Sequence, residues 1–394
     1  SVHLELAEKT GAEIVYGQRA KTTFPTHKVK DGDELTLGKI KLKFLETPGH
    51  TPEGITILAE TESEPLKMFT GDTLFIGDVG RPDLVGSKGF SAEQMGAMLF
   101  DSLQEKILPL PDETEVYPSH GAGSLCGKSL SKETWSTLGE QKKVNYALKP
   151  MSKEEFIQVV TANQPEVPAY FPVSATQNLK GSLALDKLPK PTKLSTEEVE
   201  KFDGVVVDLR QNFEFGAAHI PNSINIGLSG QFASWAGTLI PIGTPVALVA
   251  ENLKQVDEGF MRLARVGIET VKGFILISEF TGETKSVEQI SVEKVNELLQ
   301  ENEIQFVDVR RVPEFNAGHA PKTINIPLDK LSIELEKIDP VKPTYLICQS
   351  GFRSSIGSSI LENAGFETIY NVSGGTKAWI EAGLETESSL SACA

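Results

Sequence analysis

The spacing of apolar and polar residues predicts strands and helices along the whole chain. Residues 34–49 and 65–77 contain β-branched and apolar runs that close on glycine or proline, which is typical of strands. Residues 91–108 carry apolar positions at a helical spacing, with Ser91 as an N-cap and Glu93 as an acid in the first turn. Residues 146–196 are rich in proline, lysine and polar residues, which indicates a helix followed by a long linker.

The second half of the chain contains an internal duplication. Residues 208–226 and 308–326 are identical at ten of nineteen positions, at an offset of 100 residues. Each copy follows an acidic stretch of helical pattern and a buried strand, and each precedes a second strand, a helix and a third strand. Strands that alternate with helices form parallel sheets covered by those helices. We therefore predict an α/β domain with a parallel sheet, built twice.

The composition limits the class of partner. The 394 residues include 38 Lys+Arg and 54 Asp+Glu, which gives a formal charge of −16. At roughly 100–200 residues per domain, this length indicates two to four domains. An acidic surface repels phosphate backbones and anionic headgroups, so we expect no nucleic acid and no membrane as partners.

No apolar run approaches the ~18 residues of a transmembrane helix. The three scattered cysteines, Cys126, Cys348 and Cys393, fit a reducing compartment, and we predict a cytoplasmic protein with Cys393 as a bystander.

A strand of the second copy ends at Cys348 and continues into a polar loop and a helix. The loop consists of Gln349, Ser350, Gly351, Phe352, Arg353 and Ser354. A turn from a strand into a helix places the thiol at the helix N-terminus, where unpaired N–H groups and the helix dipole favour an anion. Gly351 permits a tight loop around the sulfur, and Arg353 adds a positive charge. The pattern therefore predicts a lowered pKa and a nucleophilic thiolate at Cys348. The alternative is a buried structural cysteine.

This loop resembles the active loop of rhodaneses, Cys-x-x-Gly-x-Arg. Other rhodanese signatures are Asp308-Val-Arg310, Glu314-Phe315, Gly318-His319-x-Pro321 and Gly374-Gly375-x-x-x-Trp379. The resemblance covers about residues 290–384 and implies that Cys348 carries sulfane sulfur as a persulfide held by the loop amides. Cysteine phosphatases have five residues between Cys and Arg where this chain has four, which favours sulfur over phosphate. We expect Asp308 and Arg310 to form a structural ion pair and His319 to be structural.

The first copy lacks this loop chemistry. Aligning the two copies places Ala250 opposite Cys348, and the loop glycine and arginine are also absent. Without a thiolate there is no sulfur acceptor. We therefore predict an inactive repeat with a structural or docking role, the alternative being a surface that positions the active repeat.

Three motifs in the first 145 residues carry metal-ligating side chains on strand-end loops. His50 follows Thr-Pro-Gly, Asp72 follows the apolar run Phe-Thr-Gly, and His120 follows Tyr-Pro-Ser. Imidazole and carboxylate groups are ligands for a hard to borderline metal. Cys126 lies shortly after His120, where it could carry sulfur, shape the pocket, or pack as an inert thiol.

These motifs resemble the metallo-β-lactamase fold, an αββα sandwich with its metal site on the loops at the sheet ends. The family's first motif, His-x-His-x-Asp-His, does not occur in the sequence, so we expect an upstream segment to be missing. Residues 80–84, Gly-Arg-Pro-Asp-Leu, look like those of persulfide dioxygenases. That resemblance implies one Fe(II) per chain, with His50 and Asp72 as two ligands and the third upstream; zinc is the alternative. It places His120 near the site or on a second metal, and Arg81 on an anionic persulfide.

The order of these parts resembles fusions of a persulfide dioxygenase with rhodanese domains. We predict five segments: a truncated metallo-β-lactamase-like α+β domain (1–148), a helix and linker (149–195), an inactive rhodanese-like domain (196–288), an active rhodanese domain (289–386) and a tail (387–394). The resemblance implies Fe(II)-dependent oxygenation of a small thiol persulfide by O2 to sulfite, and transfer of sulfane sulfur through Cys348 to give thiosulfate.

Two other functions fit the same residues. The first is a zinc-dependent thioester hydrolase of glyoxalase II type fused to a sulfurtransferase. The second is a degenerate lactamase-fold module that docks partners and leaves Cys348 as the only active centre. By the general prevalence of symmetric oligomers, we expect a homodimer or homotetramer.

Overall fold

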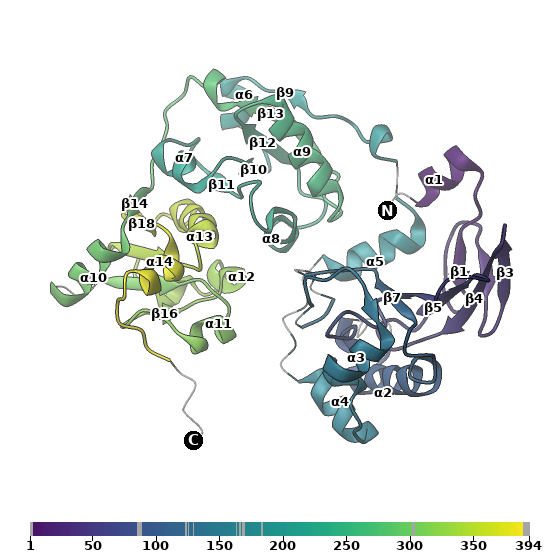
Figure 1. Cartoon of the computed structure of the whole chain (residues 1–394). Helices are drawn as coiled ribbons and strands as arrows, with labels where there is room; N and C mark the ends of the chain where they lie inside the picture. Colours follow the sequence, from purple (N-terminus) through teal and green to yellow (C-terminus); the bar gives the residue numbers. More distant parts are fainter. Residues whose placement is uncertain are drawn as a thin grey trace. The chain divides into compact units, whose positions relative to one another are not determined.

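The chain folds into two compact units, residues 1–184 and 185–394 (Figure 1). The computed structural model describes residues 3–84, 89–122, 124, 126–128, 130–162, 164, 167, 170–182, 184–301 and 304–388. Cys393 and most of the predicted tail lie outside these residues. None of the described helices is long and apolar enough to cross a membrane.

The first unit is built around one mixed sheet of six strands. In spatial order these are β3 (Glu34–Leu37), β4 (Ile40–Glu46), β5 (Ile55–Glu60), β6 (Lys67–Gly71), β7 (Glu115–Pro118) and β8 (Ser136–Thr137). Neighbouring strands are antiparallel except β6 and β7, which are parallel. A separate parallel pair is formed by β1 (Val15–Gly17) and β2 (His27–Val29).

Helices cover one face of this sheet. The first unit contains α1 (His3–Thr10), α2 (Ala92–Ser102), α3 (Leu138–Val144), α4 (Lys153–Thr161) and α5 (Phe171–Lys180). Met68 and Val116, on neighbouring strands, are fully buried in a core that also contains Leu99 of α2 and Phe156 of α4. The helix predicted after Ser91 is confirmed, because Ser91 caps α2 in a capping box with Gln94.

In the segment predicted as a helix and linker, the described residues form two α-helices, α4 and α5. The first, α4, contributes Phe156 and Val160 to the core of the first unit. The second, α5, begins in the proline-rich stretch and has Pro172 in its first turn, where a proline costs no hydrogen bond. Proline therefore marks a helix start here as well as a loop, which composition alone does not separate.

The second unit contains two five-stranded parallel sheets. The first repeat comprises β9 (Thr192–Lys193), α6 (Thr196–Glu200), β10 (Val205–Asp208), α7 (Asn212–Ala217), β11 (Ser223–Asn225), α8 (Phe232–Leu239), β12 (Val246–Ala250), α9 (Leu253–Ala264) and β13 (Val271–Leu276). The second comprises β14 (Glu288–Ile290), α10 (Val292–Glu301), β15 (Gln305–Asp308), α11 (Val312–Ala317), β16 (Ile324–Asn325), α12 (Leu328–Leu331), β17 (Thr344–Ile347), α13 (Phe352–Asn363), β18 (Ile369–Val372) and α14 (Gly375–Glu381).

The two sheets have the same strand order, which confirms the predicted duplication. The first runs β11-β10-β12-β13-β9 and the second β16-β15-β17-β18-β14, with corresponding strands in corresponding places. All neighbouring pairs are parallel. At one edge of each sheet lies the strand that precedes the first helix of its repeat, β9 in the first and β14 in the second. The residues after β12 and β17 therefore occupy equivalent positions at the carboxyl edges of the two sheets.

Candidate functional sites

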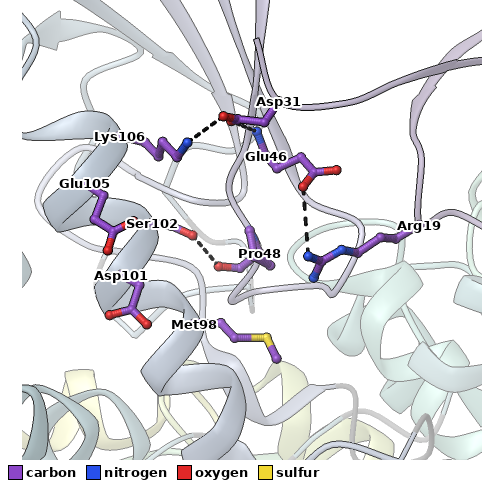
Figure 2. A pocket seen from close by; sticks show the side chains of 9 residues that line it. All are labelled: Arg19, Asp31, Glu46, Pro48, Met98, Asp101, Ser102, Glu105 and Lys106. Carbon is purple, nitrogen blue, oxygen red and sulfur yellow. Dashed lines mark hydrogen bonds and ion pairs between the residues drawn. The ribbon is translucent and has the colours of Figure 1, made fainter. Parts of the chain in front are cut away.

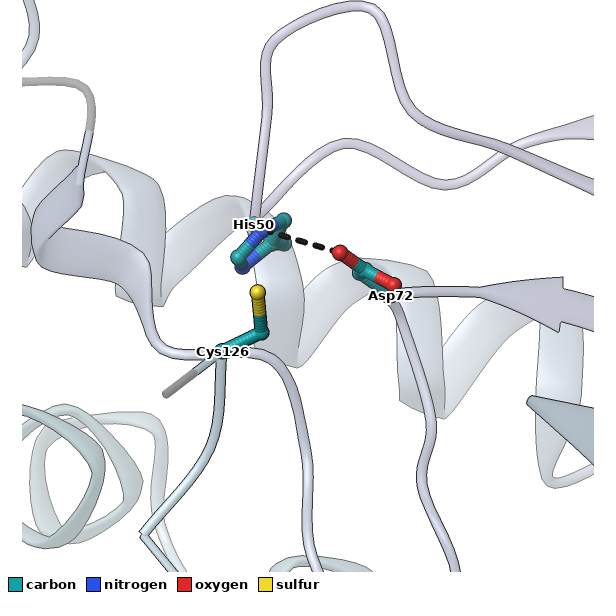
Figure 3. A group of neighbouring side chains, drawn as sticks. All are labelled: His50, Asp72 and Cys126. Carbon is teal, nitrogen blue, oxygen red and sulfur yellow. Dashed lines mark ion pairs between the residues drawn. The ribbon is translucent and has the colours of Figure 1, made fainter. Parts of the chain in front are cut away.

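Four of the predicted side chains of the first unit gather at the ends of its strands. His50 Nε2 lies 3.3 Å from Asp72 Oδ2, and His120 Nε2 lies 3.5 Å from the same oxygen. The ligand atoms of His50, Asp72 and Cys126 all lie within 4.8 Å of one another (Figure 3). The structure therefore adds Cys126 to the donor group itself, whereas the sequence predicted it only near the site.

Strand topology accounts for this convergence. Asp72 and His120 follow β6 and β7, which are parallel neighbours, so both side chains leave the same edge of the sheet. His50 lies on the loop between β4 and β5. Gly80 allows the next loop to approach this group: an added Cβ would lie 1.9 Å from the Asp72 carbonyl oxygen and 2.8 Å from His50 Cβ. No sequence pattern indicates this role for Gly80, because only the fold shows which atoms a glycine faces.

The hydrogen bonds of His50 and Asp72 suit a metal. His50 Nδ1 lies 3.0 Å from the carbonyl oxygen of Arg81, and because a carbonyl only accepts, Nδ1 carries the proton. Nε2 is then left for a ligand, as in protein metal sites where a backbone oxygen orients the imidazole. Within the part of the chain that the structure describes, Asp72 Oδ1 is buried without a hydrogen-bond partner. A buried unpaired carboxylate oxygen beside imidazole and thiol donors fits a divalent cation.

The hydrogen bonds among these side chains also shift the pKa values of His50, His120 and Asp72. Burial alone would lower the pKa of His50, but hydrogen bonds to Asp72 and Cys126 raise it to about 9. Hydrogen bonds to Asp72 and Cys126 likewise raise the pKa of His120 to about 10. Burial would raise the pKa of Asp72, but hydrogen bonds from His120 and His50 hold it well below its usual range. Without a metal, the cluster therefore favours charged imidazoles around a carboxylate.

Cys126 shares in this network. Burial opposes its ionisation, but hydrogen bonds from His120 and His50 outweigh burial and lower the thiol pKa to about 6. In metal-free protein we therefore expect the rate of Cys126 alkylation by iodoacetamide to rise through a midpoint near pH 6, because only the thiolate reacts. Peptide mass spectrometry follows this residue separately from Cys348.

A matched variant and added metal test the cause of this shift. His120→Ala removes one of the hydrogen bonds that lower the pKa, so its midpoint should move to higher pH. Added Zn²⁺ should slow the alkylation, because a metal-bound thiolate is a weaker nucleophile. A midpoint near the ordinary thiol pKa of 9.0 in the parent protein would contradict the geometry.

Arg81 lies beside this site, but its side chain is bound within the protein. Arg81 Nε donates to Asp83 Oδ1 at 2.7 Å and Nη2 to Asp83 Oδ2 at 2.5 Å. Arg81 is only 1% exposed. The sequence predicts that Arg81 binds substrate; the structure shows its carbonyl orienting His50 and its guanidinium held by a carboxylate two residues later.

A pocket of about 440 Å³ lies between α2 and the loop that precedes His50 (Figure 2). Ser102 Oγ donates to the Pro48 carbonyl oxygen at 2.7 Å and joins the two walls. Lys106 pairs with Asp31 at 2.6 Å, and the wall also carries Arg19. Charges of both signs line this pocket.

The second site surrounds Cys348, which is 1% exposed at the end of β17. The backbone N–H of Gly351 donates to Cys348 Sγ at 3.2 Å, and Ser354 Oγ lies 3.4 Å from the same sulfur. Gly351 has φ +94°, so the loop curls around the thiol in a conformation that glycine adopts without strain. The predicted turn around the sulfur is therefore present.

Backbone N–H groups at the N-terminus of α14 bind carbonyl oxygens of this loop. The backbone N–H of Thr376 donates to the Cys348 carbonyl oxygen at 2.7 Å, and that of Lys377 to the Gln349 carbonyl oxygen at 3.1 Å. A Cβ added at Gly375 would lie 2.2 Å from the Cys348 carbonyl oxygen. Gly375, the second glycine of the Gly-Gly signature, thus allows α14 to approach the loop closely.

Arg353 forms a two-point ion pair with Glu314. Its two terminal nitrogens lie 2.7 Å from the two carboxylate oxygens. Burial would raise the pKa of Glu314, but the hydrogen bonds to Arg353 lower it. This ion pair holds the Arg353 guanidinium against α11 and fixes the first turn of α13. Arg353 therefore positions the loop.

The remaining signature residues are structural in both repeats. Arg310 Nε donates to Asp308 Oδ2 at 2.8 Å, and Arg210 Nε donates to Asp208 Oδ1 at 3.0 Å. His319 Nδ1 lies 2.9 Å from the Phe315 carbonyl oxygen, as predicted for a structural histidine. At the equivalent of Cys348, the first repeat has the fully buried Ala250.

Comparison with known proteins supports both the rhodanese part and the metallo-β-lactamase-fold part of the chain. The family model of the rhodanese-like domain matches residues 291–382. A crystal structure of a metallo-beta-lactamase from Staphylococcus aureus is 31% identical, covers 69% of this chain and 80% of its own, and superposes with a TM-score of 0.63. The chain belongs to the metallo-β-lactamase family, as a fusion with a C-terminal rhodanese domain.

Two curated relatives match the metallo-β-lactamase-fold part of this fusion over shorter stretches. The mitochondrial persulfide dioxygenase of Bos taurus is 33% identical over 132 residues, 34% of this chain and 44% of the relative. The hydroxyacylglutathione hydrolase of Dictyostelium discoideum is 36% identical over 109 residues, 27% of this chain and 37% of the relative. The fusion thus spans less than half the length of each of these relatives.

Proposed function

We propose that this fusion protein oxygenates a low-molecular-weight thiol persulfide at an Fe(II) centre and transfers sulfane sulfur through Cys348, yielding thiosulfate. The observation that carries the proposal is the convergence of His50, Asp72 and Cys126 in a chain that also encloses a thiol in a rhodanese loop. Both sites then handle sulfur. The likeness to a persulfide dioxygenase supports the same substrate class.

In the proposed first reaction, His50 and Asp72 would hold the iron with Cys126 as a further donor, and His120 would lie beside them. A bound Fe(II) with open positions would supply the sites for the persulfide and O2. The Arg81 carbonyl keeps the His50 proton on Nδ1, so that Nε2 points into the site. His120 is half-exposed beside these ligands, so an N–H of its imidazole can donate a hydrogen bond to the anionic persulfide.

In the proposed second reaction, the Cys348 thiolate attacks the terminal sulfur of a persulfide. The new bond joins the two sulfurs, and the sulfur–sulfur bond of the donor breaks to release its thiolate. Sulfite then attacks the outer sulfur of the Cys348 persulfide, which forms thiosulfate and returns the Cys348 thiolate. The Gly351 N–H and the Ser354 hydroxyl stabilise negative charge on Sγ at the start and end of this cycle.

A zinc-dependent thioester hydrolase is the second candidate, because the chain also resembles a hydroxyacylglutathione hydrolase. One experiment separates the two. Protein reconstituted with Fe(II) or with Zn²⁺ is given glutathione persulfide and, separately, S-lactoylglutathione. The proposal predicts O2 uptake and sulfite with iron and persulfide, and no thioester hydrolysis above background. Rapid hydrolysis by the zinc form without O2 uptake by the iron form would favour the hydrolase.

A further inference from the structure

The helix that begins at the active loop lies between the two repeats. It is α13, and Figure 1 shows it beside β11 of the first repeat. Its residues Ser354, Ser355, Ser358 and Ser359 are at most 2% exposed. Buried hydroxyl groups need hydrogen-bond partners, either within their own helix, as for Ser358 Oγ on the Ser354 carbonyl oxygen, or on a neighbouring element. For two of these serines, the partner belongs to the repeat that has no thiol.

Asn225, at the end of β11, binds two successive turns of α13. Ser355 Oγ donates to Asn225 Oδ1 at 2.6 Å, and the Asn225 backbone N–H donates to Ser359 Oγ at 3.2 Å. The Asn225 side-chain nitrogen donates to the carbonyl oxygens of Asp208 and Arg210, at 3.2 and 3.0 Å. These last bonds fix the amide, so that its oxygen faces Ser355.

The contact with Asn225 lies one residue from the contact with the thiol. Ser355 binds Asn225, and the preceding Ser354 lies 3.4 Å from Cys348 Sγ. Because both belong to the first turn of α13, a shift of Ser355 moves Ser354 with it. Asn225 is 2% exposed, so water does not replace its hydrogen bond.

Further contacts from the first repeat reach the loop and both ends of α13. Asn212 Nδ2 lies 3.5 Å from the Gly351 carbonyl oxygen. The Phe352 ring lies 3.8 Å from the positions that a Cβ would take at Gly227 and Gly230. At the far end of the helix, His219 Nε2 lies 3.0 Å from Glu362 Oε2. The first repeat therefore holds α13 along its whole length.

We propose that the first repeat is one wall of the Cys348 site and that Asn225 is a positioning residue, which acts through Ser355 to hold Ser354 and the loop N–H groups on the sulfur. This inference rests on the proposed role of Cys348 as the sulfur carrier. It assigns a task to a domain that has no nucleophile: the domain sets the geometry of the loop in its neighbour.

The test compares two equivalent asparagines. Asn225→Ala removes the bond to Ser355, whereas Asn325→Ala removes the matching side-chain bonds inside the second repeat, to the carbonyl oxygens of Asp308 and Arg310, both at 2.8 Å. We expect Asn225→Ala to slow Cys348 alkylation about tenfold, and to lower sulfurtransferase kcat about tenfold with KM unchanged. Asn325→Ala should change both rates less than threefold. Alkylation of Cys126 in the same molecules is the internal control.

A second variant keeps the inference testable if Asn225→Ala does not fold. Ser355→Ala removes the same bond from the other side and should slow Cys348 alkylation to the same degree. In the double variant the two losses should not add, because a single interaction is removed. Equal effects of Asn225→Ala and Asn325→Ala, or unchanged rates in Asn225→Ala and Ser355→Ala, would overturn the inference. Alkylation needs no sulfur substrate, so slowed alkylation in a protein without sulfurtransferase activity would leave the inference standing and remove the proposed function instead.

Discussion

Replacing Cys348 with serine is expected to lower the thiosulfate:cyanide sulfurtransferase activity by about 10³-fold or more. The reason is that a serine hydroxyl stays protonated at neutral pH and forms no persulfide, while the loop keeps its shape around an isosteric side chain. Among the described residues the one other thiol is Cys126, which lies in the first unit, so no second thiol of these residues stands in the loop. Cyanolysis of thiosulfate, followed as thiocyanate, measures the loss.

Cys126→Ser is the matched control for this experiment. It removes the other described thiol, which lies in the metal-type cluster of the first unit. We expect its sulfurtransferase activity to stay within about twofold of the parent protein, since Cys126 belongs to a different compact unit. Comparable activity in Cys348→Ser and the parent would show that sulfur passes through another group.

Replacing Asp72 with asparagine is expected to weaken metal binding by about 10²-fold or more, and O2 uptake with glutathione persulfide in proportion. Asp72 contacts both His50 and His120, and its Oδ1 is buried without a partner among the described residues. The substitution keeps the size of the side chain but removes the negative charge that attracts the cation. Competition for Fe(II) or Co²⁺ with a colorimetric chelator measures the affinity.

Asp31→Asn serves as the control for this loss. Asp31 is also a carboxylate of the first unit, but it pairs with Lys106 at 2.6 Å in the pocket beside α2. Its metal affinity and its O2 uptake should match those of the parent protein. Sulfurtransferase activity should be unchanged in both variants. Equal metal affinity in Asp72→Asn and the parent would exclude Asp72 as a ligand.

The parts of the fold that could be predicted are those indicated by patterns among residues close together in the sequence. The duplicated segments 208–226 and 308–326, with the strands and helices that precede and follow each, predicted two parallel sheets, and the identical strand orders confirm them. Ser91 as an N-cap and Glu93 as a first-turn acid predicted the start of α2 for the same reason, because this signal lies within a few residues. Strand ends predicted the grouping of Asp72 and His120, since β6 and β7 are parallel neighbours.

Contacts between distant residues could not be predicted in this way. Ser355 and Asn225 are 130 positions apart, and nothing in either local sequence shows that they meet. The residues around Gly80 carry no pattern that indicates a close approach. Only the fold shows how closely it lies to Asp72 and His50. The binding of Arg81 by Asp83 was also missed, because a motif gives the residue type but not the direction of its side chain.

The central claim is that the two sites act in sequence on sulfur, and product analysis tests it most directly. Iron-loaded protein and its Cys348→Ser variant are given glutathione persulfide and O2, and sulfite and thiosulfate are quantified as they form. The account predicts enzyme-dependent thiosulfate from the parent protein, and sulfite without enzyme-dependent thiosulfate from the variant, at equal O2 uptake. Thiosulfate formed by the variant as fast as by the parent, or no O2 uptake by either protein, would contradict it.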